Sequence, residues 1–175
     1  MALLPILEVP DPRLRLKAAP VDTVDARVRN LIGNMFETMY DAPGIGLAAV
    51  QVGALDRLFV MDLQTEGDDG VALKTPRAFI NPELVWVSDE RSTYNEGCLS
   101  IPEQYAEVER PARVRARWLD QDGEGHEEDL DGLTATCVQH EIDHLNGVLF
   151  IDHITRLKRD ILLRKLAKAR RDKDK

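Results

Sequence analysis

The sequence predicts an α+β fold in which antiparallel strands surround a central helix and an amphipathic helix ends the chain. Short apolar runs typical of strands lie in the middle of the sequence, between residues 58 and 119. Helical periodicity is confined to one segment before them and two segments after them. Strands that are grouped together and followed by helices, instead of alternating with them, favour the α+β class.

Length and composition are those of an ordinary globular domain. The chain has 175 residues, 43% hydrophobic and 31% charged, and roughly 100–200 residues can bury a core without disulfides. We therefore expect a single domain over residues 1–175. Its two cysteines, Cys98 and Cys137, are too few for a disulfide framework, which favours a reducing compartment. Since no secretory signal, presequence or membrane-spanning apolar run is present, we expect a cytoplasmic protein without membrane contact.

Charge is unevenly distributed along the chain. Residues 153–175 contain ten Lys or Arg against three Asp or Glu, a formal charge of +7, whereas the preceding residues carry −15. A basic tail on an acidic body is typical either of a solvated helix face or of a surface for an anionic partner. The sequence alone leaves both interpretations open.

The first predicted helix covers residues 24–40, where apolar residues recur at helical spacing after the capping candidates Asp22 and Thr23. Pro43-Gly44-Ile45-Gly46 breaks it, and a run of small apolar residues at 47–53 follows. Side chains this small predict that the segment passes close to another part of the molecule.

Three β-type runs come next, at residues 58–63, 79–80 and 84–87. The turn-rich segment 64–70 and Asn81-Pro82 separate them, so we expect separate short strands. Residues 113–119 alternate apolar residues with arginines before the turn signal Asp122-Gly123. This pattern predicts a mostly antiparallel sheet with one face in the core and the other in water.

Two helices follow the strands. The first covers residues 133–146, with Gly147 at the position of a C-terminal cap. The second begins near residue 154 and is amphipathic, with most of its Lys and Arg on one side. Its other side is predicted to carry Ile154, Leu157, Ile161, Leu162, Leu166 and Ala169.

The helix at 133–146 contains His140-Glu141-Ile142-Asp143-His144, an H-E-x-x-H pattern. Residues four apart share one helix face, so both imidazoles can bind one metal ion. A carboxylate between them, Glu141, can take a proton from water and pass it to a leaving amine. The alternative is a charged helix with two surface histidines, but two of only four histidines in the chain have this spacing.

A catalytic metal site of this kind needs a third protein ligand. In one zinc-protease class this ligand is a histidine six residues after the pattern, but Phe150 stands there, and His153 lies three residues too late. We predict that His153 is an ordinary hydrogen-bonded histidine. Cys98 after Gly97 is the better candidate, because a thiolate binds divalent transition metals strongly. A lone cysteine is, however, usually only a small buried apolar residue.

Three segments resemble the signature motifs of one enzyme family. They are Gly44-Ile45-Gly46-Leu47-Ala48-Ala49-Val50-Gln51, Glu96-Gly97-Cys98-Leu99-Ser100 and Gln139-His140-Glu141-Ile142-Asp143-His144. In content and order they are similar to those of peptide deformylases, metal-dependent amidohydrolases that remove the formyl group from the N-terminal formylmethionine of new proteins and release formate. The resemblance extends over nearly the whole chain, and it strengthens the assignment of Cys98 as a ligand.

The resemblance implies a role for each matching residue. Cys98, His140 and His144 would be the metal ligands, and Glu141 the general acid/base. The side-chain amide of Gln51 and the backbone N–H of Leu99 would bind the formyl oxygen as oxyanion donors. The residues implied to contact substrate are Ile45, Gly46, Gly97, Leu133 and Cys137, so that Cys137 is a wall of the methionine pocket and not a second thiolate ligand.

The resemblance also implies cofactor and partners. It favours Fe²⁺ as the one divalent transition metal per chain, although His₂Cys plus water would accept Zn²⁺ equally. Substrates would be N-formylmethionyl nascent peptides, and the basic C-terminal helix (residues 153–175) would dock on the ribosome. Tyr94 and Thr136 depart from the aliphatic residues expected near the pocket, which leaves subsite preference open.

Three other interpretations are weaker. Residues 44–49 fit a G-x-G-x-x-A dinucleotide pattern, but that pattern must follow a strand and here follows a helix. A protease that cuts internal peptide bonds is disfavoured by the absent downstream ligand. An inactive ribosome-associated metal-binding module is disfavoured because Gln51 and Glu141 are both present.

Overall fold

The computed structural model describes residues 2–175, and its architecture is α+β, as predicted. The helices are α1 (Ala26–Asp41), α2 (Gly132–Leu145) and α3 (Arg156–Lys173), with short 3₁₀ helices η1 (Pro12–Arg15), η2 (Ala49–Val52) and η3 (Phe150–His153). The strands are β1 (Gly46–Ala48), β2 (Leu58–Met61), β3 (Arg77–Val87), β4 (Arg91–Cys98), β5 (Ile101–Pro111), β6 (Val114–Leu119) and β7 (Gly125–Leu130).

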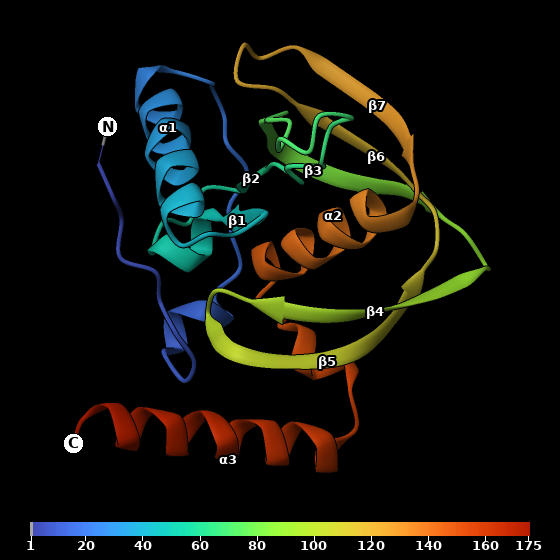
Figure 1. Ribbon diagram of the computed structural model, residues 1–175. Helices are drawn as coiled ribbons and strands as arrows, with labels where there is room; N and C mark the ends of the chain where they lie inside the picture. Colours follow the sequence, from blue (N-terminus) through green and yellow to red (C-terminus); the bar gives the residue numbers. More distant parts are fainter. Residues whose placement is uncertain (1) are drawn as a thin grey trace.

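The strands form two sheets, and every strand pairing is antiparallel. The larger sheet has the order β1-β2-β3-β6-β7, and the smaller sheet is the β4–β5 hairpin. In Figure 1, α2 lies between the two sheets, α1 lies beside β1 and β2, and α3 lies outside, along β5. The helix that carries the H-E-x-x-H pattern is therefore the central one.

Strand β2 shows how its apolar sequence places these helices. Successive side chains of a strand point to opposite faces, and all four residues of β2 are buried. Leu58 and Val60 join the cluster that includes α1, whereas Phe59 and Met61 join the cluster that includes α2. A strand covered on both faces needs a continuous apolar run, which is what residues 58–61 provide.

Strand β3 corrects the prediction of two short strands. It runs without interruption from Arg77 to Val87, and its pairing with β6 shifts register between Ile80 and Glu83. Asn81 has φ +50°, and its side-chain amide bonds both the N–H and the carbonyl of Val21 at 2.8 Å. Asn81-Pro82 therefore forms a bulge, where the proline does not need to donate a hydrogen bond to the neighbouring strand. The strand continues through it.

The helix ends agree with the sequence only in part. Asp25, and not Asp22 or Thr23, caps α1, because its carboxylate accepts a hydrogen bond from the Val28 N–H at 3.0 Å. After α2, Gly147 has φ +74°, and a Cβ there would lie 2.5 Å from the carbonyl oxygen of Arg15. The predicted C-terminal glycine is thus confirmed, and both conformation and close packing require it.

Helix α3 corrects the predicted apolar side of the tail. Leu162 and Leu166 are buried with residues of β5 and η3, but Leu157 is 71% exposed and Ile161 is 43% exposed. The helix contacts the body along one narrow stripe, formed by Leu162 and Leu166 one turn apart with Leu163 partly buried beside them. Within residues 2–175, no helix is long and apolar enough to cross a membrane.

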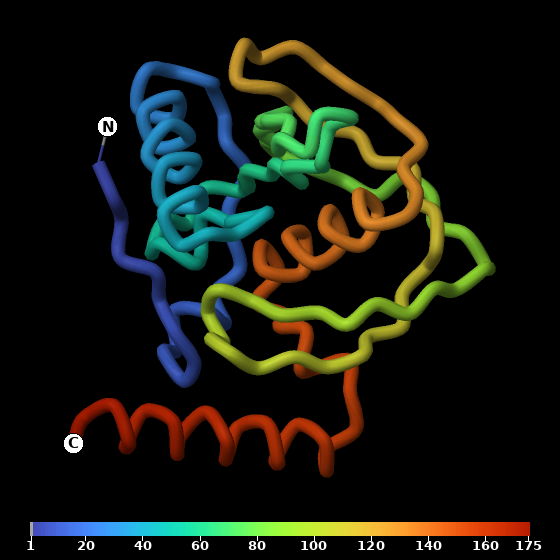
Figure 2. The backbone as a smooth tube through the Cα atoms, viewed as in Figure 1, coloured from blue at the N-terminus to red at the C-terminus, as the bar shows by residue number. Residues whose placement is uncertain are grey.

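The N-terminal segment ties the elements around the site together. As Figure 2 shows, it passes below α1 toward the turn of the β4–β5 hairpin and the C-terminal half of α3. The Leu7 N–H donates to the Gln51 carbonyl at 2.7 Å, and the Val9 N–H donates to the Ser100 carbonyl at 2.9 Å. This segment therefore holds η2 and the hairpin turn in a fixed relative position.

Candidate active site

A cavity of about 710 Å³ opens between the segment around β1, the end of the β4–β5 hairpin and α2. It is lined by every residue that the sequence assigns to the site except His144, which is buried behind it. These lining residues are Ile45, Gly46, Gln51, Gly97, Cys98, Leu99, Leu133, Cys137, His140 and Glu141. Three segments far apart in the sequence thus meet at one hollow.

Cys98, His140 and His144 form a cluster at the base of this region. Each offers one ligand atom, and these atoms all lie within 4.8 Å of one another. The Cys98 Sγ lies 3.2 Å from the His144 Nε2. Two imidazoles and one thiolate suit a divalent transition metal, and the set leaves a position for water. The residues present therefore fit the metal that the resemblance implies.

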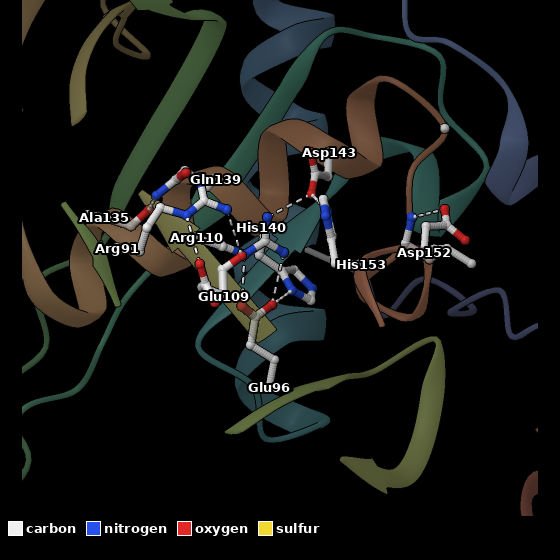
Figure 3. A network of polar contacts seen from close by, with 12 residues as sticks. Arg91, Glu96, Glu109, Arg110, Ala135, Gln139, His140, Asp143, Asp152 and His153 are labelled. Atoms are coloured by element: carbon white, nitrogen blue, oxygen red, sulfur yellow. Dashed lines mark hydrogen bonds and ion pairs between the residues drawn. The ribbon is translucent and has the colours of Figure 1, made fainter. Parts of the chain in front are cut away.

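A buried ion-pair network holds His140 from behind (Figure 3). The ring Nδ1 of His140 lies 2.9 Å from Glu96 Oε1. The Arg110 guanidinium donates to both oxygens of Glu96, at 2.7 and 2.9 Å, and to Asp143 at 2.8 Å. A carboxylate that accepts the Nδ1–H leaves Nε2 free as the ligand atom. Figure 3 places His153 at the other end, 2.7 Å from Asp143, so His153 is the hydrogen-bonded histidine predicted.

Charge in this network follows from burial and pairing. Burial opposes ionisation of Glu96, but its hydrogen bonds with His140 and Arg110 together lower its pKa. Burial also opposes the charged form of His140, but its contacts with Cys98 and Glu96 raise the pKa of the ring. Burial lowers the pKa of His144 well below the usual range, and nearby His140 adds to this effect. His144 is therefore neutral, the form that can bind a metal.

Glu141 is buried at the cavity, next to His140 and close to Gly46. Burial raises the pKa of Glu141 to about 7, which the positive charge of His140 partly opposes. Among the described residues, its Oε2 has no hydrogen-bond partner. A Cβ at Gly46 would lie 2.6 Å from Glu141 Oε1, so only glycine leaves this carboxylate in place. A carboxyl group poised near neutral pH and free to exchange a proton is suited to general acid/base work.

The side-chain amide of Gln51 is oriented by its own 3₁₀ helix. Its Oε1 accepts a hydrogen bond from the Ala48 N–H at 2.9 Å, so its Nε2 faces the hairpin turn. There Nε2 donates to Ser100 Oγ at 3.0 Å and lies 3.5 Å from Cys98 Sγ. Leu99 is the first residue of the two-residue turn between β4 and β5, since Cys98 pairs with Ile101. Gln51 and Leu99 therefore flank Cys98 on the cavity side.

The walls of the cavity beside α2 are largely apolar. Ile45 and Leu133 are partly open to the cavity mouth, at 39% and 43% exposure. Cys137 is buried, and burial raises the pKa of its thiol well above the usual range, so it packs as a small neutral group. Tyr94, Thr136 and the exposed Tyr105 complete this part of the lining.

Fold and site together define the class of the protein. An acid/base carboxylate, a His₂Cys cluster and oriented N–H donors face one cavity that is open to a ligand. This arrangement is that of a hydrolase whose ligand set would hold a divalent metal, and that metal would activate water for attack on an amide.

Comparison with known proteins identifies the family. The polypeptide deformylase family matches residues 3–160. A peptide deformylase from Rhizorhabdus wittichii is 64% identical over 172 residues, covering 98% of this chain and 97% of the relative, and one from Zymomonas mobilis is 60% identical over 171 residues, covering 98% and 97%. The crystal structure of the Ehrlichia chaffeensis enzyme superposes with a TM-score of 0.91 at 40% identity and 98% coverage of both chains.

The chain therefore belongs to the polypeptide deformylase family. It is an enzyme, a hydrolase that removes the N-formyl group from nascent peptides. The three alternative interpretations, a dinucleotide-binding protein, a protease and an inactive metal-binding module, are therefore rejected.

Sequence reasoning missed the residues that support the site from behind. Arg110, Asp143 in its bond to Arg110, and Ser100 beside Gln51 received no role. Glu96 lay within a recognised motif, and its position two residues before Cys98 on one strand face was the available signal. Arg110 had no such signal, because only the antiparallel pairing of β4 and β5 brings it near Glu96.

Proposed function

We propose that the chain hydrolyses the N-formyl amide of N-formylmethionyl nascent peptides with the residues that line this cavity, and that it does so as a single catalytic domain. The observation that carries the proposal is the Glu141 carboxyl, buried beside the cluster of Cys98, His140 and His144, with an Oε2 that has no hydrogen-bond partner within residues 2–175. The methionine side chain would lie against Ile45, Leu133 and Cys137, with the peptide backbone passing Gly46 and Gly97.

Cys98, His140 and His144 would hold one divalent metal ion, which when bound acts as a Lewis acid on the attacking water and the formyl carbonyl. Glu96 supports this set by fixing the ring of His140, and Arg110 supports Glu96. The chain therefore supplies ligands whose orientation is set before any metal binds.

Glu141 moves the proton. Its carboxylate takes a proton from the attacking water and gives it to the nitrogen of the leaving amine, after which formate and the free amino terminus separate. A pKa of about 7 favours both transfers near neutral pH, because the group is then a usable base and a usable acid.

Gln51 and Leu99 bind the oxygen of the formyl group. The Gln51 Nε2 cannot turn away, because Ala48 holds its Oε1. Donors fixed before the reaction stabilise the developing negative charge without reorganising. The Ser100 hydroxyl, which accepts from the same Nε2, positions the amide further.

Replacement of Glu141 by glutamine tests the acid/base role. Glu141→Gln should lower kcat on formyl-Met-Ala by roughly 10²–10⁴-fold, because it keeps the shape but removes the basic carboxylate. Metal content measured on the same preparation should match the parent protein. Glu107→Gln, the same change at an exposed position of β5, is the control and should leave kcat unchanged. Retained metal with retained activity in Glu141→Gln would remove Glu141 from the mechanism.

Replacement of Cys98 by alanine tests the ligand set. Cys98→Ala should lower metal content and activity together, since two histidines alone hold a divalent ion weakly. Cys137→Ala is the matched control, because it removes the other cysteine and should leave one metal per chain. A Cys98→Ala protein with one tightly bound metal and full activity would require a different third ligand.

We propose Fe²⁺ as the physiological metal, on the resemblance of the three motifs to the family. The His₂Cys set would also accept Zn²⁺. Metal-free protein loaded without oxygen with either ion should be compared on formyl-Met-Ala. Higher kcat/KM with Zn²⁺ than with Fe²⁺ would contradict this assignment.

We also propose that the protein acts in the cytoplasm and docks on the ribosome through α3. Lys158, Lys165 and Lys168 are exposed on this helix, next to the exposed Leu157 and Ile161. Binding to ribosomal RNA phosphates would weaken as salt rises. Removing residues 160–175 is a poor test, because it would take the buried Leu162 and Leu166 out of the core.

Charge reversal is the sharper test of docking. Changing the three lysines to glutamate should reduce co-sedimentation with ribosomes and spare turnover of a free formyl peptide. The control variant makes the same change in net charge on the body, at the exposed residues Lys17, Arg29 and Lys74. Equal co-sedimentation of the two variants would refute docking through α3.

A further inference from the structure

Beside the exposed Tyr105, one wall of the cavity carries the hydroxyl groups of Tyr94 and Thr136. Tyr94 shares a face of β4 with Glu96, two residues on, and Thr136 shares a face of α2 with His140, four residues on. Glu96 on the strand contacts His140 on the helix. The next pair of residues on the same two faces is Tyr94 and Thr136, which lies one helical turn before His140 along α2. A Cβ at Gly132 would lie 3.9 Å from the Tyr94 hydroxyl, which confirms that β4 runs along the helix in this direction.

These hydroxyls are not used by the fold. Thr136 as a whole is only 4% exposed, but it lines the cavity, and among the residues described neither its hydroxyl nor that of Tyr94 makes a hydrogen bond within the chain. Thr38 in α1 behaves differently, because its hydroxyl donates to the Asn34 carbonyl at 2.7 Å. A hydroxyl in a cavity wall that has no partner within the chain remains available as a donor to a ligand that carries an acceptor.

The methionine side chain satisfies such donors poorly. Its thioether sulfur is only a weak acceptor. Oxidation to the sulfoxide converts this sulfur into a polar group with an acceptor oxygen at the same position of the side chain. A purely aliphatic pocket would bury that oxygen without a donor, which is costly, whereas a pocket with two hydroxyls can pair it.

We propose that this pocket also accepts N-formyl peptides whose first residue is methionine sulfoxide, with Thr136 and Tyr94 as the donors to the sulfoxide oxygen. The inference rests on the proposed function, because it takes this cavity as the methionine pocket. The reaction is the same hydrolysis: water adds to the formyl carbon, the C–N bond breaks, formate leaves and the amine keeps a proton. The sulfoxide is not reduced, so no further reactant is needed.

The experiment compares kcat/KM for formyl-Met-Ala and for its sulfoxide on the same preparations of metal-loaded enzyme. The wild type should hydrolyse both. Thr136→Val has nearly the same shape without the hydroxyl, and it should lower kcat/KM for the sulfoxide about tenfold, mostly through KM, the factor expected for one lost hydrogen bond. The readout is the ratio of the two kcat/KM values, which should fall because the thioether, a weak acceptor, loses less than the sulfoxide when the hydroxyl is removed. Tyr94→Phe should act in the same direction.

Two further variants separate recognition from structure. Thr136→Ser keeps the hydroxyl and should retain the wild-type ratio of the two kcat/KM values. Thr93→Val makes the same change on the exposed face of β4 and should alter neither substrate. A general packing defect would lower both rates together and leave their ratio unchanged.

The outcomes distinguish this inference from the function on which it rests. If wild-type enzyme does not hydrolyse formyl-Met-Ala, the proposed function itself fails. If it hydrolyses formyl-Met-Ala but not the sulfoxide, the further inference is overturned. The inference is also overturned if Thr136→Val and Tyr94→Phe both keep the wild-type ratio within a factor of two.

Discussion

Arg110→Met should destabilise the protein by about 3–5 kcal/mol, the cost of leaving a buried charge without its partner. The side chains of Arg110 and Glu96 are each 5% exposed and are joined by two hydrogen bonds, and a third bond reaches Asp143. Methionine fills a similar length but donates nothing. Glu96 would keep His140 as its remaining side-chain partner.

The free energy of unfolding, measured by urea denaturation of the metal-free protein at neutral pH, checks this value without a contribution from metal binding. Arg115→Met is the matched control. Its pair with Asp129 has the same 2.7 Å separation as the pair of Arg110 and Glu96, but its side chains are 48% and 69% exposed. Solvent screening limits such a pair to less than about 1 kcal/mol.

A double variant separates lost attraction from an uncompensated charge. Adding Glu96→Gln to Arg110→Met should recover part of the lost stability, because the buried charge is then absent. Equal costs for Arg110→Met and Arg115→Met would refute the reasoning, and so would strictly additive losses in the double variant. Metal affinity should also fall about 10–100-fold in Arg110→Met, since His140 loses part of its support.

Three further changes follow from close contacts elsewhere. Gly46→Ala should lower kcat/KM on formyl-Met-Ala about 10²-fold with little change in Tm, because the new Cβ displaces Glu141, and full activity would contradict this. Gly147→Ala should lower the free energy of unfolding by at least about 1–2 kcal/mol, since φ is +74° and a Cβ would lie close to the Arg15 carbonyl. An unchanged midpoint of urea unfolding would contradict this prediction. Tyr40→Phe should cost about 1 kcal/mol at pH 7, because Tyr40 donates to Asp62 at 2.5 Å. Burial opposes ionisation of Asp62, but its hydrogen bonds lower its pKa. The stabilisation that this carboxylate provides is therefore present above the unfolded pKa of about 3.9 and is lost as pH falls through the folded pKa. If the stability difference between Tyr40→Phe and the wild type grew in acid, this reasoning would be contradicted.

Sequence periodicity predicted those elements whose burial depends on apolar side chains. The three helices and β2 lie where apolar spacing indicated, within a few residues. The hairpin of β4 and β5 was not predicted, because β4 reads Arg-Ser-Thr-Tyr-Asn-Glu-Gly-Cys and buries Glu96 where a strand normally buries an aliphatic residue. Its inner face supplies a polar site, so the usual alternation is absent.

The site was predictable to the extent that its residues are close in sequence. His140, Glu141 and His144 share one helix face by spacing alone. Cys98 was the best candidate for the third ligand, which family resemblance strengthened while adding Gln51. Arg110 and Glu96 are 14 residues apart, and Arg110 and Asp143 are 33 apart, so pairing and packing bring them together and no local pattern does. The orientation of Gln51 likewise depends on the backbone N–H of Ala48, a contact that the residue types do not specify.

Tyr94 and Thr136 show where sequence and structure must be combined. Sequence marked them as polar residues where aliphatic ones were expected, and this departure left subsite preference open. The structure places β4 along α2 so that the two residues share one wall, one turn from His140. Departures from local rules concentrate at functional positions because burying a polar group is tolerated where a partner compensates for it. Among the residues described, neither hydroxyl makes a hydrogen bond within the chain, and the cavity they line is where an external acceptor can reach them.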